Sequence, residues 1–565
     1  MELLYMDWLK NRRMVYLLVV AVWAIIYLPC LDKLEFRGEE GRRVFPGQNM
    51  LHEGNWMVPH ISDEPYYNKP PGVNWLVALS FVITGQENEW AARLPSAVSI
   101  LMFVSLLMLY PAKWFRLDER LIASLIYLTA GTMIEKGRMI ELEGVVSSIT
   151  GIVIFYWMAE DSNNRNKWLL WIPLGLIMGF GMLLKGPFVP FFFYTTIIPI
   201  LFYQKRCLKQ MFSPQHIVGF LIMAAIFFGW YLDAKKHTSG EAMTNQMVSQ
   251  LLIRFNPKNT DWGYWSKEVI DAFVNFLPWV LFLPALWNKQ AISQFEGERK
   301  IMFNGCRLGL IIGFVLINLL PMTESRYSIP FFCQASILLG MTCANLTAST
   351  KFDLKIRDSI YGFYSFAAFA PIVLLVVLRA VPASLISHLP ISESAANEII
   401  SLLSLPVTVH GLFVATICIV IYFALLKYKE RINNTPTICA ALAGLMVMFA
   451  IIWQGFGIPA YIHINERYRP AAAAVNSIVP ENENICLYRP GYKTFTFYMR
   501  KPLTFILEKE KIDNSVEYLV ISRPMFDELL TDTAIKSRNP EIVYEFSDMI
   551  EGQVILIKFN NTENG

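Results

Sequence analysis

Long apolar runs recur along this chain and restrict the folds that it can adopt. About 13 of them, with an uncertainty of one or two, are long enough to cross a hydrocarbon core about 30 Å thick. The composition agrees, since 54% of the residues are hydrophobic and the mean hydropathy is +0.39, which is too apolar for an ordinary soluble domain. The sequence therefore predicts an α-helical polytopic membrane protein, whose spans we place at Met14 to Leu31, Ala91 to Tyr110, Leu121 to Ile134, Leu142 to Ala159, Trp168 to Leu184, Phe188 to Tyr203, His216 to Leu232, Ile270 to Trp287, Cys306 to Leu320, Ser328 to Leu346, Tyr361 to Leu378, Pro406 to Leu426 and Pro436 to Trp453.

Lysine and arginine residues are concentrated in every second loop between these runs. Short cytoplasmic loops retain such residues, so the pattern predicts a cytoplasmic amino terminus. An odd number of spans then places the carboxy-terminal tail on the outer side. The first run lacks a small-residue cleavage pattern and further spans follow it, so we expect a retained anchor. The residues that define the pattern are Lys10, Arg12 and Arg13; Lys113, Arg116 and Arg120; Arg165 and Lys167; Lys205, Arg206 and Lys209; Lys289, Arg299 and Lys300; Lys351, Lys355 and Arg357; and Lys427, Lys429 and Arg431.

The composition changes beyond Trp453, where Pro, Asn, Glu and Lys become frequent. Short β-branched runs in this part predict strands, and two further segments, Arg467 to Ile478 and Arg523 to Leu530, predict helices. We therefore divide the chain into a transmembrane domain over residues 1–460, with its first outer loop at 32–90, and a small soluble α/β domain over residues 461–565 on the outer, periplasmic side. The predicted strands are Ile485 to Tyr488, Tyr518 to Ile521, Ile542 to Tyr544 and Val554 to Ile557.

Charged residues gather on the side of the membrane that this topology makes the outer one. An ionisable group at membrane depth is costly unless it faces water or a partner, which makes such a group a candidate for function. Any single one of them could simply anchor a helix end or belong to a solvated loop. The one-sided set favours a site, and it comprises Glu39, Glu40, Arg42, Lys69, Lys136, Arg138, Glu141, Glu143, Lys185, Arg254, Lys258, Glu324 and Arg326.

Acidic groups beside several cations are suited to the chemistry of a phosphate-bearing substrate. Arginine can hold a phosphate through two hydrogen bonds and lysine holds it as a point charge. A nearby carboxylate can accept the proton of an attacking hydroxyl or amine. Because nucleotide sugars are not supplied outside the cytoplasm, a transferase there needs a donor that is already in the membrane, and a polyprenyl-phosphate sugar meets that need.

Other features of the sequence exclude several classes of function. The net charge of +3 is small and distributed, and it gives no support to nucleic-acid binding. The eight cysteines show neither a CxxC motif nor a Cys/His spacing typical of a metal site, so we expect no disulfide framework and no cysteine-bound metal. His52 and His60 have no partner ligands nearby in the sequence and are most simply surface residues.

An ordered series of short motifs resembles one family over nearly the whole chain. The family is the GT-C glycosyltransferases of the protein O-mannosyltransferase and lipid A aminoarabinose transferase type. Single motifs such as Lys-Gly-Pro are weak, and the order of the series carries the resemblance. The motifs are Arg37-x-Glu39-Glu40-x-Arg42, Leu51-His52-Glu53-Gly54-Asn55-Trp56-Met57-Val58-Pro59, Tyr67-Asn68-Lys69-Pro70-Pro71, Leu183-Leu184-Lys185-Gly186-Pro187, Arg254-Phe255, Leu277-Pro278-Trp279 with the apolar residues to Pro284, Arg326-Tyr327-Ser328-Ile329-Pro330, and Tyr488-Arg489-Pro490-Gly491-Tyr492 with the aromatic residues to Tyr498.

The resemblance implies roles for the acidic residues. Glu39 stands where the family usually has an aspartate that acts as general base or orients the acceptor, and Glu143 stands at the family's second acidic position. Both positions depart from aspartate, and a glutamate carboxylate reaches about one methylene further from the backbone. Glu40 or Glu141 is therefore an alternative to Glu39 as the base.

The resemblance also implies roles for the cations and a mechanism. Arg42 and Lys69 match residues that bind the donor phosphate, and Lys185, Arg254 and Arg326 are further contributors to the same pocket. An acceptor nucleophile would attack the anomeric carbon directly, with inversion, while the cations stabilise the departing phosphate. We expect no cofactor and no metal requirement, although two nearby carboxylates leave room for a divalent ion.

Three functions remain open from the sequence. The first is a transferase in the bacterial inner membrane that moves a sugar from a polyprenyl-phosphate donor to lipid A or a related envelope glycolipid. The second is a protein O-glycosyltransferase that acts on a secreted polypeptide. The third is a transporter or flippase of lipid-linked substrates, which would not need acidic residues gathered outside the bilayer.

Overall fold

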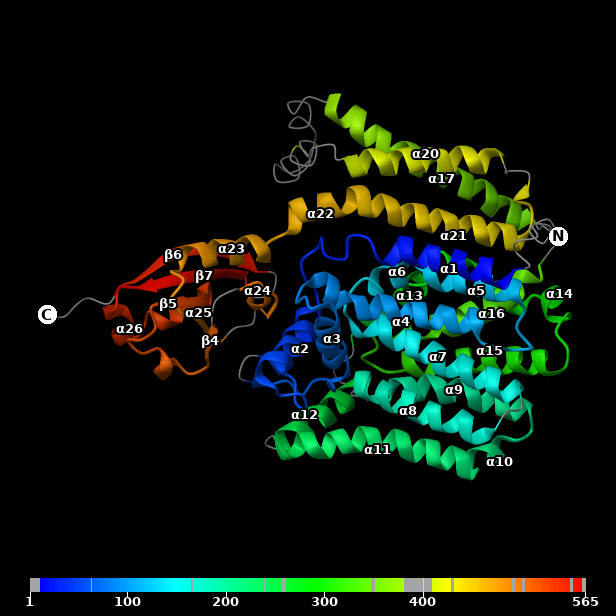
Figure 1. Cartoon of the computed structure of the whole chain (residues 1–565), viewed down its shortest axis with the longest axis horizontal. Helices are drawn as coiled ribbons and strands as arrows, with labels where there is room; N and C mark the ends of the chain where they lie inside the picture. Colours follow the sequence, from blue (N-terminus) through cyan, green and yellow to red (C-terminus); the bar gives the residue numbers. More distant parts are fainter. Residues whose placement is uncertain are drawn as a thin grey trace.

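The computed structural model of the chain shows a bundle of helices with a small sheet domain beyond one of its ends (Figure 1). This architecture confirms the predicted fold class, a polytopic helical protein with a carboxy-terminal α/β domain. The structure describes residues 11–61, 64–163, 166–237, 240–255, 261–346, 351–380, 400, 409–427, 431–489, 493–499, 503–548 and 552–560.

Each predicted apolar run overlaps a helix of the bundle. Pro406 and the two residues after it lie outside the described part of the chain. The helices are α1 (Arg12–Tyr27), α4 (Glu89–Leu109), α5 (Leu117–Thr129), α7 (Leu142–Ser162), α8 (Lys167–Lys185), α9 (Phe188–Tyr203), α11 (Pro214–Lys236), α13 (Trp262–Val274), η5 (Trp279–Trp287), α15 (Gly297–Asn318), α16 (Phe331–Ala344), α17 (Lys351–Ala380), α20 (Val409–Lys427) and α21 (Thr435–Ile452).

Length and hydropathy identify six membrane-spanning candidates within the described residues. These are α4, α7, α8, α11, α15 and the long helix Thr435–Asn465, which joins α21 to α22 (Ile458–Asn465). The apolar pair α13 and η5 is bent by 85°, so it forms either a broken span or a re-entrant segment. Shorter apolar helices include α9 and α16, and the total of about 13 spans stays a prediction.

Close approach of backbones holds the bundle together. Helix α7 runs through its middle, with 94% of its apolar window buried. Helices α8 and α11 meet at Gly175 and Gly219, where a Cβ on Gly175 would lie 2.3 Å from the carbonyl oxygen of Gly219. Small residues at such crossings let helices pack in a membrane, where the solvent offers no hydrophobic driving force.

The first outer loop is itself folded, which hydropathy did not predict. It forms α2 (Gly41–Glu53), the short hairpin of β1 (His60–Ile61) and β2 (Glu64–Pro65), and α3 (Gly72–Thr84). Figure 1 places α2, α3 and α12 (Gly240–Leu252) at the end of the bundle that faces the sheet domain. It places α10 (Cys207–Met211) and α14 (Lys289–Ile292) at the opposite end.

The carboxy-terminal domain has a five-stranded mixed sheet in the order β4-β3-β5-β7-β6. The first three strands are parallel, and β7 pairs antiparallel with both β5 and β6. All four predicted strands are confirmed, while β4 was missed. The elements are α23 (Tyr468–Ile478), β3 (Ile485–Tyr488), α24 (Lys493–Phe497), β4 (Leu503–Ile506), β5 (Tyr518–Ser522), α25 (Arg523–Leu529), α26 (Thr533–Ser537), β6 (Pro540–Asp548) and β7 (Gly552–Phe559).

The loop that follows α1 joins the sheet domain to the bundle. The Glu35 carboxylate accepts hydrogen bonds from the backbone N–H groups of Arg467, Tyr468 and Arg469, at 2.8, 2.8 and 3.1 Å, and so caps the start of α23. Arg469 in turn pairs with Glu89 at 2.5 Å. Because α22 ends at Asn465 and α23 packs on the sheet, the sheet domain begins slightly beyond the predicted boundary at residue 461.

Candidate active site

A cavity of about 380 Å³ opens where the helices of the bundle end next to the first outer loop. Its walls come from the loop before α2 and the first turn of that helix, the loop before α3, the first turn of α7, the last residue of α8, η3 (Ile253–Phe255), the start of α13, and η6 (Ser325–Ser328) with the loop before it. Seven segments of the chain thus meet at one place. The predicted site residues that line the cavity are Glu39, Arg42, Lys69, Glu143, Lys185, Arg254 and Arg326.

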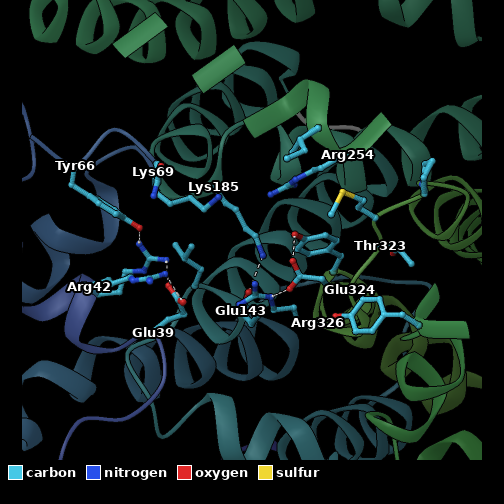
Figure 2. Close-up of a pocket in the computed structure, with 18 of the residues that line it drawn as sticks. Glu39, Arg42, Tyr66, Lys69, Glu143, Lys185, Arg254, Thr323, Glu324 and Arg326 are labelled. Atoms are coloured by element: carbon cyan, nitrogen blue, oxygen red, sulfur yellow. Dashed lines mark hydrogen bonds and ion pairs between the residues drawn. The ribbon is translucent and has the colours of Figure 1, made fainter. Parts of the chain in front are cut away.

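Figure 2 shows how these side chains are distributed around the cavity. Glu39 and Arg42 lie on one side, and Arg254 and Arg326 lie on the other. The side chains of Lys69, Lys185 and Glu143 come from segments between the two sides. The arrangement leaves cations around the whole rim of the cavity.

Glu40 does not line the cavity. Its carboxylate is fully buried and accepts two hydrogen bonds from the Arg93 guanidinium, both at 2.8 Å. It also accepts the backbone N–H groups of Arg37 and Ile140, at 3.1 and 3.0 Å. These four hydrogen bonds tie the loop before α2 to Arg93 of α4 and to the backbone before α7.

Glu39 faces the cavity with a cation on each oxygen. Its Oε1 accepts a hydrogen bond from Arg42 Nη1 at 2.8 Å, and its Oε2 lies 3.6 Å from Arg43 Nη2. The Glu39 side chain is 31% exposed, so water and a substrate can reach it. Arg43 also donates to the Tyr66 hydroxyl at 3.2 Å, which fixes the guanidinium beside the carboxylate.

Glu143 and Lys185 form a buried ion pair at the floor of the cavity. The distance from Lys185 Nζ to Glu143 Oε1 is 2.9 Å, and the two side chains are 5% and 4% exposed. The Lys185 ammonium also lies 4.9 Å from the ring centre of Tyr327. Arg254 stacks near the same ring at 4.8 Å, so Tyr327 lies between two cations.

Arg326 has its own carboxylate partner. It forms an ion pair with Glu324, and the Tyr327 hydroxyl donates to the same carboxylate at 2.7 Å. This pair keeps the Arg326 guanidinium directed along the wall of the cavity, as Figure 2 shows.

Lys69 has no ion pair and no side-chain hydrogen bond among the described residues. Burial, with the positive charges of Arg254 and Lys185 nearby, lowers the pKa of Lys69 to about 7. In the part of the chain that the structure describes, six cationic and four acidic side chains line the cavity. An anion placed there would be stabilised by the excess charge and would raise the pKa of Lys69 again.

Several lining residues were not among the predicted site residues. Arg43 stands next to Arg42 and four positions after Glu39, a spacing that places it beside Glu39 once the segment is helical. Glu324 belonged to the outer charged set but had no predicted role. The other unforeseen lining residues include Tyr66, Asn68, Asp261, Tyr264 and Tyr327.

The rest of the outer charged set lies elsewhere. Lys136 pairs with Glu141 at 2.7 Å, and Arg138 donates to the backbone carbonyls of Ile26 and Pro29. Lys258 lies outside the described residues. As far as the structure describes the chain, no three His, Cys, Asp or Glu side chains are grouped as metal ligands.

Several known proteins are similar to this chain in sequence. The family described as dolichyl-phosphate-mannose-protein mannosyltransferase matches residues 68–230. The undecaprenyl phosphate-alpha-4-amino-4-deoxy-L-arabinose arabinosyl transferase 2 of Proteus mirabilis (strain HI4320) is 24% identical over 382 residues, which are 65% of this chain and 66% of the relative. A transferase of the same name, without the final numeral, from Yersinia enterocolitica serotype O:8 / biotype 1B (strain NCTC 13174 / 8081) is 29% identical over 365 residues, or 62% and 63% of the two chains. The chain thus spans less than two thirds of the length of each.

A solved structure shows the same fold. The crystal structure of ArnT from Cupriavidus metallidurans bound to undecaprenyl phosphate is similar with a TM-score of 0.72 and 15% identity. The similarity covers 97% of this chain and 98% of that one, so it includes the carboxy-terminal sheet domain. The chain is a multi-pass membrane protein that is similar in sequence to ArnT-like glycosyltransferases and shares the fold of one of them.

Proposed function

We propose that the protein is an integral-membrane glycosyltransferase. It moves a sugar from a polyprenyl-phosphate donor to an envelope acceptor, lipid A or a related glycolipid, at the outer face of the bacterial inner membrane. The observation that carries this proposal is the cavity with an excess of cations. Lys69 and Glu39 both line it, and Lys69 forms no ion pair with any described residue. The names of the relatives support an undecaprenyl-phosphate donor.

The reaction is a direct displacement at the anomeric carbon. The acceptor oxygen forms the new bond to that carbon while the bond from the carbon to the phosphate oxygen breaks. The phosphate leaves with the bonding electron pair, and the proton of the acceptor hydroxyl goes to a carboxylate. The two bonds lie on opposite faces of the carbon, so the configuration inverts.

The cations act on the departing phosphate. Lys69, Arg254 and the N–H groups of Arg42 that do not bind Glu39 contact it, because fixed positive charges that face the developing charge stabilise the transition state. Lys185 is held by Glu143 and Arg326 by Glu324, so each of these carboxylates positions a cation at the wall. Glu143 is accordingly a positioning residue in this proposal.

Glu39 is the proton acceptor that this geometry favours. It is the partly exposed carboxylate on the Arg42 side of the cavity, while the Glu40 carboxylate is buried against Arg93. Glu141 pairs with Lys136 and does not line the cavity. The cationic side chains take the part of a Lewis acid, so the proposed reaction needs neither a metal ion nor another cofactor.

The proposed orientation puts the cavity and the sheet domain on the outer side. The end of the bundle that holds α10 and α14 lies opposite the end that holds α2, α3 and α12 (Figure 1). Lys209 belongs to α10 and Lys289 to α14. Cationic loops are retained in the cytoplasm. The amino terminus is then cytoplasmic and the carboxy-terminal domain periplasmic.

A protein O-glycosyltransferase is the second candidate, because the matching family is described by a protein acceptor. Both candidates use the same donor chemistry and differ in the acceptor. Mass spectrometry of lipid A and of secreted proteins, from cells with and without this protein, separates them. A mass increase of lipid A supports the first and an increase on polypeptides supports the second.

The direct test uses purified protein in lipid vesicles with polyprenyl-phosphate sugars and candidate acceptors, scored by product mass. Glu39→Gln should abolish transfer and leave donor binding intact, since glutamine cannot take the proton. Glu53→Gln, an exposed change in the same segment, is the matched control and should keep wild-type turnover. Wild-type turnover in Glu39→Gln would refute the assignment of Glu39.

Turnover of the wild-type protein should also persist with EDTA, and loss of turnover would show a metal requirement.

A further inference from the structure

A second cavity, of about 340 Å³, lies on the other side of the loop that carries Glu39. The same two segments of chain build both cavities. In the loop before α2, Leu34 and Arg37 line the second cavity, whereas Glu39 lines the first. In the segment that runs from α6 (Gly131–Lys136) into the first turn of α7, Arg138 lines the second cavity and Glu143 lines the first.

Three arginines line the second cavity with a single carboxylate, that of Glu135, which forms an ion pair with Lys136 at 3.9 Å. Of its three arginines, Arg93 is paired with Glu40. The Arg138 guanidinium donates to two backbone carbonyls, and the positive charges of Arg93 and Arg37 add to burial in lowering its pKa to about 10. The Arg37 side chain has a buried Nε without a hydrogen-bond partner, and its guanidinium lies 5.4 Å from the ring centre of Tyr461.

Much of the remaining wall is apolar. Ile134, Met139 and Ile458 contribute to it, together with Trp453. Trp453 begins a π-helical turn, Trp453–Gly457, where α21 passes into α22. Such turns interrupt a helix at a cost and occur frequently at functional sites. The cavity therefore offers a guanidinium at one place and hydrocarbon surface beside it, which fits an anionic amphiphile.

We infer that the second cavity binds a phosphate group of the acceptor glycolipid, with Arg37 as its ligand and the apolar wall against part of the lipid. This inference rests on the proposed function, because it takes the acceptor to be a phosphorylated envelope glycolipid. The inference explains why the buried Nε of Arg37 has no hydrogen-bond partner among the described residues. It also explains why two segments of the chain line both cavities. An acceptor held there and a donor held in the first cavity would lie on either side of the loop that presents Glu39.

Binding of a lipid to the full-length protein tests the inference without any need for transfer. The protein is placed in phosphatidylcholine nanodiscs, and native mass spectrometry measures binding of bisphosphorylated lipid A, dephosphorylated lipid A, phosphatidylglycerol and undecaprenyl phosphate. Arg37→Gln removes a side chain that holds no described hydrogen bond, so folding should persist. The variant should bind bisphosphorylated lipid A about tenfold more weakly, which is the effect of one lost charge-assisted hydrogen bond. Its affinity for undecaprenyl phosphate should be unchanged.

A second variant and a control complete the test. Ile134→Trp fills the cavity and should weaken lipid A binding in the same way, while Lys33→Gln removes an exposed charge from the same loop and should have no effect. In the transfer assay, Arg37→Gln should raise the KM for lipid A and leave kcat unchanged.

Three results would overturn the inference. The first is wild-type lipid A binding in both cavity variants, and the second is an equal loss of undecaprenyl phosphate binding, which would assign Arg37 to the donor. The third is equal binding of phosphatidylglycerol or of dephosphorylated lipid A. Absence of transfer with lipid A binding intact would instead refute the proposed function.

Discussion

The adjacent residues Glu39 and Glu40 have side chains in different environments. The Glu39 side chain faces a wet cavity, whereas that of Glu40 is buried in a network with Arg93. Arg93 also donates to the carbonyls of Leu31 and Leu34, so the pair ties the loop to α4. A run of charged residues in a sequence carries no information on which member is buried.

Glu40→Gln should therefore destabilise the protein much more than Glu39→Gln. The first change leaves the buried Arg93 guanidinium uncompensated, and breaking a buried pair costs about 3 to 5 kcal/mol. The second breaks a partly exposed pair, which costs about 1 kcal/mol or less. Thermal unfolding of the purified variants in detergent measures the difference. Equal unfolding temperatures would contradict the bracing role of Glu40.

The low pKa of Lys69 predicts a pH dependence of donor binding. Bound phosphate stabilises the ammonium form, so the empty protein loses the Lys69 proton at a lower pH than the complex does. As the pH rises above about 7, binding requires proton uptake, and affinity should fall by up to about tenfold per pH unit. Undecaprenyl phosphate binding is best measured from about pH 7.5 to 9, where a phosphate monoester with a pKa near 6 is already doubly charged.

Lys69→Arg is the matched control for this pH dependence. A guanidinium keeps its charge over the whole range, so the affinity of this variant should be nearly flat with pH. A slope in the variant equal to that of the wild type would show that another group titrates.

At the scale of elements, α24 of the sheet domain and the residue that follows it hold the loop before α2 in place. The Tyr498 hydroxyl accepts the Phe36 backbone N–H at 2.9 Å and donates to Glu89 at 2.7 Å. The rings of Phe36 and Phe497 meet edge to face at 4.8 Å. A Cβ on Gly41 would lie 2.7 Å from Thr494 Oγ1, so the first turn of α2 approaches α24 closely.

Tyr498→Phe should loosen this loop without unfolding either domain. It leaves the Phe36 N–H and the Glu89 carboxylate short of a partner, at a cost of about 1 to 3 kcal/mol. Hydrogen exchange of the peptide that contains Phe36 to Glu40 should become faster, and kcat should fall. Tyr544→Phe on β6 is the control and should leave both quantities unchanged. Unaltered hydrogen exchange in Tyr498→Phe would show that the sheet domain does not stabilise the loop that carries Glu39.

Hydropathy predicted the helices of the bundle better than those of the outer loop. The helices of the bundle are long apolar segments, so they can be found from hydropathy alone, without a helical periodicity of hydrophobic residues. Helix α2 is polar on average and contains Pro46, and α3 is apolar but too short to cross a bilayer. Strand β4 was missed because it is only four residues long, lies at the sheet edge and includes the exposed Thr504.

At the scale of the whole molecule, the cavity, the first outer loop and the sheet domain share one end of the bundle (Figure 1). The cationic loops near α10 lie at the other end. Topology is therefore testable with a single pair of fusions. Alkaline phosphatase fused after the last residue should be active, and fused after Lys209 it should be inactive. The reverse result would put the cavity in the cytoplasm and contradict the proposed use of an outer lipid-linked donor.

The sequence by itself determined the class of fold, the apolar helices of the bundle and four of the five strands of the carboxy-terminal domain, because hydrophobic runs and alternating patterns are local properties. Seven of the eight site residues that it predicted line the first cavity, since charges near a bilayer are rare enough to stand out, and their roles stay predictions. The position of Glu40, the pairing of Lys185 with Glu143 and the second cavity around Arg37 depend on the tertiary structure alone. The physical reason is that burial and pairing are set by segments up to hundreds of residues apart, and no local pattern in the chain records which charges those segments bring together.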